Sequence, residues 1–340
     1  MPPTDPVALA MDLMRHDSTS GTEGAVIAFA EERLREQGWT VRRIPVDGER
    51  ANLLATGPEA PLATLSTHLD TVPPYLPPVL EGDVLRGRGA CDAKGIAAAM
   101  WCAAERLREG GVPVALLLVV GEETAHDGAQ AAADFARVEG IASRVLVNGE
   151  PTESTLALGT KGAVRLRLRC TGRAAHSAYP HLGRSATMEL VRLLAELDGL
   201  ELPADPLLGE TTINVGHLAG GVADNVVAPW AEARLMARLV GPAEPVVEQL
   251  RRWIGDRAEV EVGAMVPAVR LGTLPGFPTS VAAYATDIPV LTGWGTPYLY
   301  GPGSIHVAHT PDEHVLVREL HEAVGAYERI VRGALERGDP

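Results

Sequence analysis

The order of apolar and polar positions over the first 160 residues predicts helices and strands in alternation. Residues 21–38 and 92–111 carry apolar side chains at the spacing of a helix that covers a core, and each stretch ends at glycine. Residues 113–120 are a continuous apolar run, which is typical of a strand buried on both faces. Alternation of such segments predicts an α/β sheet covered by helices. Further strands are expected at 39–46, 51–57, 61–69 and 143–148, and a further helix at 128–140.

The pattern changes near residue 159. Residues 160–174 alternate apolar and charged side chains, so one face of that strand should meet water. The next segments continue the order strand, helix, strand, strand, helix, strand, which is the ferredoxin-like order. We therefore expect an α/β chain in which an α+β ferredoxin-like domain, residues 161–266, is inserted into a larger domain made of residues 1–160 and 267–340.

Charge and composition exclude several classes of protein. The 340 residues carry a formal net charge of −14 without a basic stripe, which argues against a nucleic-acid-binding protein. No stretch approaches the roughly 20 uninterrupted apolar residues of a membrane span. Three cysteines without paired spacing, and a start that lacks the basic-then-apolar pattern of a leader, predict a cytoplasmic protein.

Polar side chains stand where the predicted strands end. His68 and Asp70 follow one apolar run in "STHLDTVPP", and two positions apart on an extended chain they face the same side. Glu122 and Glu123 follow a second strand, and Glu150 follows a third. Binding sites of open α/β sheets form at the carboxyl ends of the strands, so these groups should converge.

A converging set of this kind needs a cation. Asp92 adds a further carboxylate from the glycine-rich loop "GRGACDAKG", and grouped carboxylates repel unless positive charge neutralises them. Histidine with carboxylates and no thiolate suits zinc or a similar divalent ion. Each residue alone would pass for an ordinary solvated loop residue, and only their joint position predicts a metal site. Cys91 in the same loop is expected to be a small buried filler.

Five stretches in order resemble the motif set of the di-zinc amidohydrolases and peptidases. That family includes acetylornithine deacetylase, succinyl-diaminopimelate desuccinylase, aminoacylase and glutamate carboxypeptidase. The stretches are "STHLDTVPP", "GRGACDAKG", "GEET", "NGEPT" and "GPGSIHVAHTPDE". The resemblance implies a metallopeptidase-type sheet covered by helices, with the inserted domain acting as a lid.

The resemblance also implies which residues hold metal. His68 and Glu150 would hold one ion, Glu123 and His309 would hold the other, and Asp92 would bridge the two. The implied cofactors are two divalent ions per chain, zinc first, with cobalt or manganese as alternatives.

Two more residues receive roles in the same way. Glu122 would be the general base for a metal-bridged water, and Asp70 would orient the imidazole of its ligand neighbour. His306 is left outside the ligand set because the family uses one histidine in that motif. His126 and His181 are left outside it as well.

The inserted domain resembles the family's lid. In "GRAAHSAYPHLGRSA" the resemblance implies that His176 reaches the metal site of a partner subunit and stabilises the developing oxyanion. The family has asparagine where this chain has Ser185, which puts the local packing in doubt. The implied assembly is a homodimer through the lids, and the alternating strand at 163–170 is the expected pairing strand.

A substrate carboxylate would be held by groups from both domains. Asn225 and Arg238 match the lid positions that grip it, and a guanidinium suits this because its planar fork binds carboxylate through two hydrogen bonds. Arg234 lies on the same strand face, so the choice of Arg238 rests on the resemblance. Gly301 and Gly303 could offer backbone N–H groups to the same carboxylate, or could be plain turn residues.

These expectations converge on a two-metal amidohydrolase or peptidase with a small substrate that has a free carboxylate. The leading expectation is cleavage of an N-acyl amino acid of the acetylornithine or acetyl-lysine type. A dipeptidase, aminopeptidase or carboxypeptidase with the same metal centre is the alternative. A non-catalytic binding protein is a third hypothesis, which the intact base and ligands disfavour.

Overall fold

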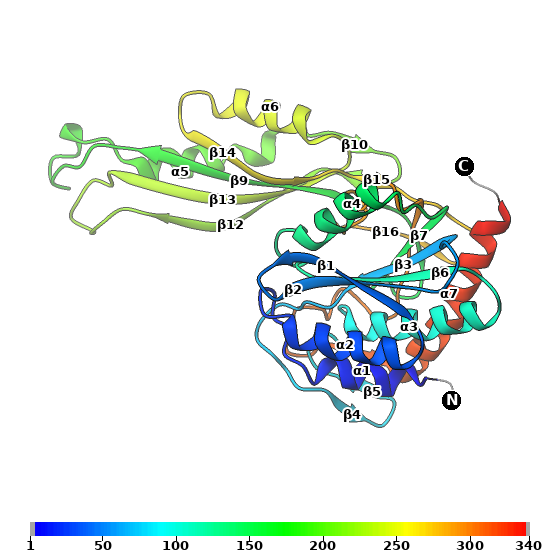
Figure 1. Ribbon diagram of the computed structural model, residues 1–340. Helices are drawn as coiled ribbons and strands as arrows, with labels where there is room; N and C mark the ends of the chain where they lie inside the picture. Colours follow the sequence, from blue (N-terminus) through cyan, green and yellow to red (C-terminus); the bar gives the residue numbers. More distant parts are fainter. Residues whose placement is uncertain (1–3, 338–340) are drawn as a thin grey trace. The chain divides into compact units, whose positions relative to one another are not determined.

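The computed structural model describes residues 4–337, and residues 1–3 and 338–340 lie outside the described part (Figure 1). The fold consists of two compact units. The larger unit takes the chain up to Leu158, Arg270–Ala282 and the segment from Thr286 onward, and the inserted unit takes Gly159–Val269 and Ala283–Ala285. That residues 161–266 fold as an independent domain stays a prediction. Within residues 4–337, no helix combines the length and apolar character that crossing a bilayer requires.

A six-stranded sheet in the order β1-β2-β6-β3-β7-β17 forms the centre of the larger unit. The strands β6, β3, β7 and β17 run parallel to one another, whereas β2 is antiparallel to both of its neighbours, β1 and β6. The carboxyl ends of the four parallel strands therefore lie at one edge. The strand bounds are β1 Thr40–Asp47, β2 Arg50–Thr56, β3 Ala63–His68, β6 Val114–Val119, β7 Val145–Asn148 and β17 Thr296–Leu299.

Helices cover both faces of this sheet. The strand β6 shows why, because Leu116 and Leu118 join one apolar core and Leu117 and Val119 join another. Figure 1 shows α1, α2 and α3 on one side of the sheet and α4 on the other. The helix bounds are α1 Pro6–Met14, α2 Gly24–Glu36, α3 Lys94–Glu109, α4 Asp127–Glu139 and α7 Val317–Arg337.

The helix α1 is absent from the sequence expectations, although its start signal is present. Asp5 accepts a hydrogen bond from the N–H of Ala8 at 3.0 Å, and Pro6 occupies the first turn. An aspartate cap followed by proline is a strong helix start. The short length of the helix, rather than a missing signal, explains the omission.

Two small sheets complete the strands outside the inserted unit. One has the order β18-β5-β4 and the other β15-β8-β16. Their bounds are β4 Val79–Glu81, β5 Val84–Arg86, β8 Leu156–Thr160, β15 Val269–Arg270, β16 Thr279–Ala282 and β18 His314–Leu316.

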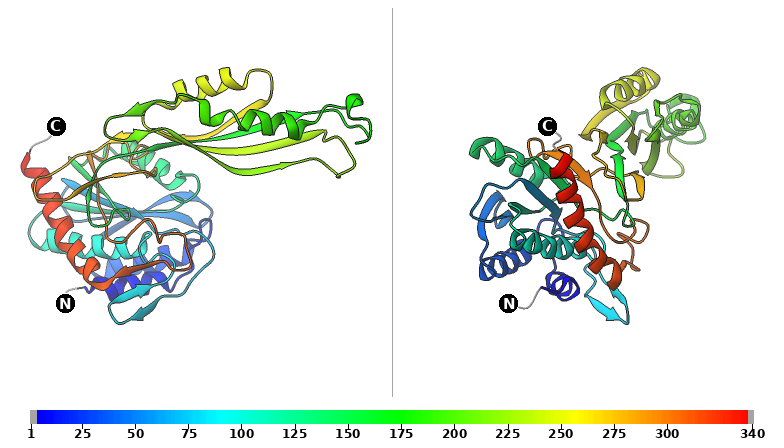
Figure 2. Two further views of the ribbon diagram at one scale, coloured as in Figure 1. Left: turned by 180° about the vertical axis from the view of Figure 1, so that it is seen from behind. Right: turned by 90° about the vertical axis from the view of Figure 1, so that its right-hand side faces the viewer.

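The inserted unit is ferredoxin-like, as expected. Its antiparallel sheet has the order β12-β13-β9-β14, and α5 and α6 pack on one face of it (Figure 2). The bounds are β9 Gly162–Thr171, α5 Ala186–Leu194, β12 Thr212–Gly220, β13 Trp230–Leu239, α6 Ala243–Ile254 and β14 Glu259–Val266, with short pairs β10 Ala204–Asp205 and β11 Gly209–Glu210 and 3₁₀ turns at Pro180–Leu182 and Leu197–Gly199.

The expectation that residues 163–170 pair across a dimer interface is wrong. These residues lie in β9, which pairs with β13 on one side and with β14 on the other. A strand with both neighbours in place has no free N–H or C=O row to offer. The outer strand β12 is an edge of this sheet instead. The alternation of apolar and charged residues correctly predicted that one face of β9 meets solvent. It carries no information about whether a strand lies at the centre or at the edge of a sheet.

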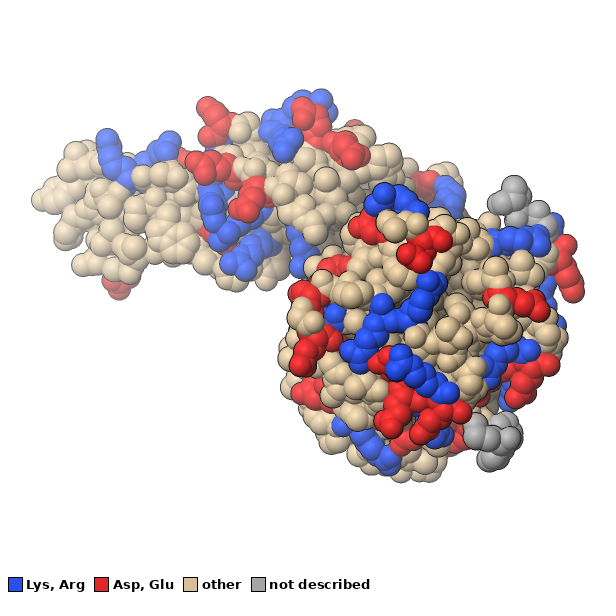
Figure 3. Space-filling model, in the orientation of Figure 1, with Lys and Arg blue, Asp and Glu red and all other residues tan. Residues whose placement is uncertain are grey.

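Charged side chains of both signs are interspersed on the face shown in Figure 3. Basic and acidic groups adjoin one another over the larger unit in this view.

Candidate metal centre

The predicted site residues of the larger unit gather at the carboxyl edge of its parallel strands. His68 is the last residue of β3, Glu122 and Glu123 follow β6, and Glu150 follows β7. Because β6, β3 and β7 are adjacent and parallel, their ends deliver these side chains to one place. Asp92 reaches the same place from the loop that precedes α3.

Asp92 lies between the two predicted ligand histidines. Its Oδ1 is 3.1 Å from Nε2 of His68, and its Oδ2 is 3.2 Å from Nε2 of His309. The same histidine nitrogen of His309 is 2.9 Å from Oε1 of Glu123. A carboxylate with one oxygen facing each histidine has the arrangement that a bridge between two ions requires.

Glu150 completes the set. Its Oε2 is 3.9 Å from Nε2 of His68, and its Oε1 is buried with no hydrogen-bond partner within residues 4–337. A buried carboxylate oxygen without a donor is costly unless a cation is present. Two histidines, three carboxylates and one orphaned oxygen fit a pair of divalent ions.

The charge balance of the cluster indicates missing positive charge. Burial raises the pKa of Glu122, Glu123 and Glu150, and neighbouring carboxylates raise it further. Burial also acts to raise the pKa of Asp92, but hydrogen bonds to its two histidine neighbours hold it well below the usual range. The pKa of His309 is raised to about 10 by hydrogen bonds to carboxylates. A dication would supply the charge that protons otherwise bring.

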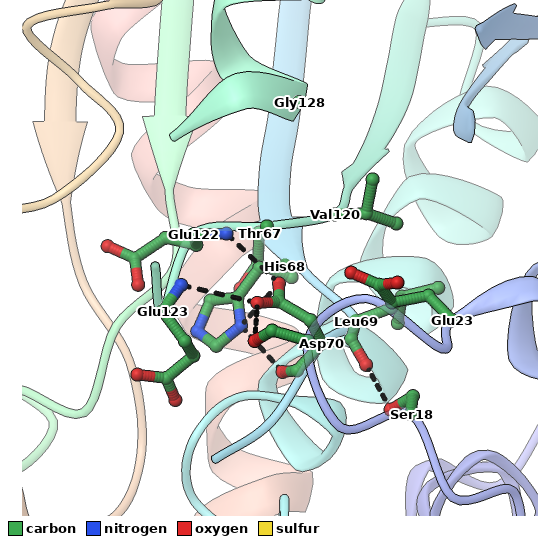
Figure 4. A network of polar contacts seen from close by, with 12 residues as sticks. Ser18, Glu23, Thr67, His68, Leu69, Asp70, Val120, Glu122, Glu123 and Gly128 are labelled. Atoms are coloured by element: carbon green, nitrogen blue, oxygen red, sulfur yellow. Dashed lines mark hydrogen bonds and ion pairs between the residues drawn. The ribbon is translucent and has the colours of Figure 1, made fainter. Parts of the chain in front are cut away.

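Asp70 lies beside the imidazole that it is expected to orient, and it has further partners. The Nδ1 atom of His68 is 2.9 Å from the backbone carbonyl of Asp70 and 3.5 Å from its Oδ1, so the carbonyl is the hydrogen-bond acceptor. The carboxylate accepts from the backbone N–H groups of Glu122 and Glu123, at 3.2 Å each, and from the hydroxyl of Ser20 at 2.7 Å (Figure 4). Asp70 therefore fixes the backbone that carries both glutamates as well as the imidazole.

The two adjacent glutamates diverge, as Figure 4 shows. Glu123 faces His309, whereas Oε1 of Glu122 is 3.8 Å from Nδ1 of His126. His126 in turn lies 2.8 Å from Oδ1 of Asp287. The sequence reasoning left His126 aside and did not single out Asp287. No spacing signal could have found Asp287, because it is remote in sequence and follows no strand.

A buried ion pair ties together the loops of Asp92 and His309. Glu313 pairs with Arg88, and its Oε1 accepts from the N–H of Gly89 at 2.8 Å and of Asp92 at 3.3 Å. Both side chains of the pair are almost fully buried. This explains why "HTPDE" and "GRGACDAKG" occur together: one motif holds the backbone of the other.

The glycines after β17 have packing roles. The N–H of Gly301 donates to Oγ1 of Thr152 at 3.0 Å, so it already has a partner, contrary to the expectation that it faces a substrate. A Cβ at Gly301 would lie 2.2 Å from the carbonyl oxygen of Glu150. Gly303 has φ +79°, and a Cβ there would lie 2.5 Å from the Cβ of Cys91, which is buried as expected. Both positions exclude larger residues for steric reasons.

The predicted lid residues lie in the inserted unit. His176 and Asn225 are exposed and belong to two adjoining loops, because Asn225 accepts from the N–H of Ser177 at 2.9 Å. Arg238 is half-buried on β13, and burial lowers its pKa, as does the charge of Arg165. Ser185 departs from the family pattern but caps α5, where its hydroxyl accepts from Met188 at 3.3 Å.

The chain is similar to known proteins in sequence and in fold. The model of the family described as "Peptidase family M20/M25/M40" matches residues 64–333. A probable carboxypeptidase of Aspergillus clavatus is 37% identical over 370 aligned residues, which cover 96% of this chain and 82% of that protein. Two crystal structures share the fold. An M20 family metallo-carboxypeptidase from Sulfolobus solfataricus has a TM-score of 0.79 at 16% identity, covering 97% of this chain and 99% of that one. A dinuclear metal-binding M20 peptidase from Bacillus subtilis has a TM-score of 0.72 at 15% identity, covering 96% of both chains.

Proposed function

Since this chain belongs to the peptidase family M20/M25/M40 and is a hydrolase that acts on peptide bonds, we propose that it is a two-metal carboxypeptidase. It removes a residue with a free carboxylate from a short peptide. The observation that carries the proposal is the position of Asp92, whose two oxygens face His68 and His309 at 3.1 and 3.2 Å.

The proposed ligand sets follow the side-chain neighbours. His68 and Glu150 hold one ion, Glu123 and His309 hold the other, and Asp92 bridges them. When bound, two divalent ions lower the pKa of water and polarise the scissile carbonyl. Zinc is the proposed metal, with cobalt or manganese able to replace it, because the donor set contains only imidazole and carboxylate.

Glu122 is the proposed general base. Its carboxylate points away from that of Glu123, so it is free to take a proton from the attacking water. Burial raises its pKa, which favours delivery of that proton to the leaving amine. Asp70 keeps this carboxylate in place by accepting from the N–H of Glu122.

The inserted unit supplies the proposed substrate contacts. Arg238 and Asn225 bind the free carboxylate, helped by Gly303, and His176 donates to the oxyanion that forms during attack. We propose that His176 acts in a partner subunit of a homodimer. The free edge of β12, with exposed Val215 and Leu218, supports this role for the inserted unit.

A peptide substrate is better supported than an N-acyl amino acid. The relative from Aspergillus clavatus is named a probable carboxypeptidase, and a structural neighbour is a metallo-carboxypeptidase. The leading expectation of an acetylornithine or acetyl-lysine deacetylase has no such support, so the alternative replaces it. The cytoplasm is the proposed compartment, supported by three cysteines that are all free thiols.

A substrate panel tests the proposal. Purified protein loaded with zinc, cobalt or manganese is assayed on N-blocked dipeptides, free dipeptides, dipeptide amides and N-acetyl amino acids. Hydrolysis of N-blocked dipeptides, lost when the C-terminal carboxylate becomes an amide, is expected. Preference for N-acetyl amino acids would instead support a deacetylase, and preference for free dipeptides would indicate a dipeptidase.

A further inference from the structure

A second polar group borders the metal cluster on the side of Glu122. Glu122, His126 and Asp287 each place one side-chain oxygen or nitrogen atom within 4.8 Å of the others. His126 donates to Asp287 at 2.8 Å, whereas its distance to Glu122 is 3.8 Å. Neither His126 nor Asp287 belongs to the ligand set proposed above.

The backbone holds His126 in an uncommon conformation. Its φ is +54°, in the left-handed region, immediately before α4. The N–H of His126 donates to the carbonyl of Gly121 at 2.9 Å, which closes the turn that starts after β6. Non-glycine residues held in this region are frequent at functional sites, because the surrounding structure must enforce them.

Asp287 has no access to solvent that would screen its charge. It is 1% exposed, and the imidazole of His126 lies beside its carboxylate and beside that of Glu122. Two carboxylates at this distance repel. The Nδ1 atom of His126 lies 2.8 Å from Asp287 and 3.8 Å from Glu122, so its partly positive N–H group offsets this repulsion.

We propose that His126, oriented by Asp287, is a positioning residue that keeps the carboxylate of Glu122 where a general base must stand. This inference rests on the proposed function, because it gives Glu122 its role. It concerns only the position of the Glu122 carboxylate and assigns no new role to the metal ligands. A displacement of about 1 Å at a reacting group costs on the order of 10²-fold in rate.

Variants of the pair test this directly. His126→Ala should lower kcat by about 10- to 100-fold with little change in KM, because the base is misplaced while substrate contacts stay. His126→Asn should keep most of the activity, since asparagine tolerates the left-handed region and its amide can donate to Asp287. His126→Ala with Asp287→Asn should regain roughly tenfold over His126→Ala alone, because the repulsion is gone.

Two further measurements separate positioning from a structural role. In a Glu122→Asp background, which keeps a base but withdraws it from the imidazole, His126→Ala should add less than about a twofold loss. Metal content should match that of the wild type in both variants, and His126→Asn, which keeps a donor for Asp287, should also keep the wild-type melting temperature. His321→Ala is the matched control, because His321 pairs with Asp5 at 3.6 Å on the exposed surface of the same unit.

Several outcomes would overturn the proposal. The first is a kcat of His126→Ala equal to that of the wild type, and the second is a complete loss of activity in His126→Asn. The third is a loss of kcat from His126→Ala that is as large in the Glu122→Asp background as in the wild type. The fourth is a third tightly bound metal ion that is present in the wild type and absent in His126→Ala. If wild-type protein hydrolyses no member of the substrate panel, the proposed function fails instead, and the pair has no base to position.

Discussion

The metal cluster and the lid loops are built in opposite ways. In the cluster, the side chains of His68 and Asp70 are 1% exposed or less, and each has hydrogen bonds within the larger unit. In the inserted unit, His176 and Asn225 are exposed, and the imidazole of His176 accepts a hydrogen bond from the N–H of Ala178 at 3.1 Å. The first two residues are buried and hydrogen-bonded within their own unit, whereas the other two present their side chains to solvent.

The difference has a physical reason. Metal ligands must stand ready before substrate arrives, so their geometry comes from strand ends and buried hydrogen bonds. Groups that bind substrate or an oxyanion gain their partners only during the reaction, and exposure leaves them free to do so. Substitutions should therefore affect metal and turnover separately, according to the unit in which they lie.

The largest expected effect is at Glu122, because it is proposed to take the proton from the attacking water. Glu122→Gln should lower kcat by about 10²- to 10⁴-fold while metal content stays the same. Metal analysis and steady-state kinetics on the same preparation check this. The matched variant Glu123→Gln should lose metal, and the reverse pattern would mean that the two roles are exchanged.

The next effect belongs to the inserted unit. His176→Ala should lower kcat by about 10²- to 10³-fold with no change in metal content, because an oxyanion donor is removed. Mixing this inactive protein with inactive Glu122→Gln, under conditions that exchange subunits, should restore activity in mixed dimers. Verified exchange without recovery, or a fully active monomer, would contradict action in a partner subunit.

A smaller effect is expected at Asp70, which hydrogen-bonds to the backbone of both glutamates. Asp70→Asn should weaken metal binding by about 10- to 100-fold, because the acceptor for Ser20, Glu122 and Glu123 is replaced by a neutral amide. Titration against a competing chelator measures the affinity. Ser20→Ala removes only one of the three hydrogen bonds and should lose less affinity.

The smallest effect is a pH dependence of the inserted unit. Hydrogen bonds, first from Arg167 and then from Arg234 and Arg169, lower the pKa of Glu232 from 4.5 to about 2. A lowered pKa in the folded state gives stability that is full above pH 4.5 and is lost as the pH falls toward 2. Melting temperatures between pH 6 and 3 should fall in the wild type and fall less in Glu232→Gln. Equal slopes in both proteins would show that these ion pairs are screened by solvent.

The local order of apolar and polar residues determines much of the architecture. Continuous apolar runs such as Val114–Val119 predicted strands buried on both faces, and the strand-helix order predicted the ferredoxin-like unit. The cluster could be predicted because parallel strands deliver the residues after their ends to one edge. His68 is the last residue of such a strand, and Glu122, Glu123 and Glu150 follow the ends of two others.

Tertiary structure alone decided the rest. The pattern of apolar and polar residues cannot tell a central strand from an edge strand, because both can have one solvent-facing side. The strand β9 was therefore taken for a pairing strand, although β12 and β14 are the edges of the sheet. Pattern also cannot show that Glu313 and Arg88 join two motifs, or that Asp287 meets His126. Those contacts link segments far apart in the chain, and only the packed fold brings them within hydrogen-bonding distance.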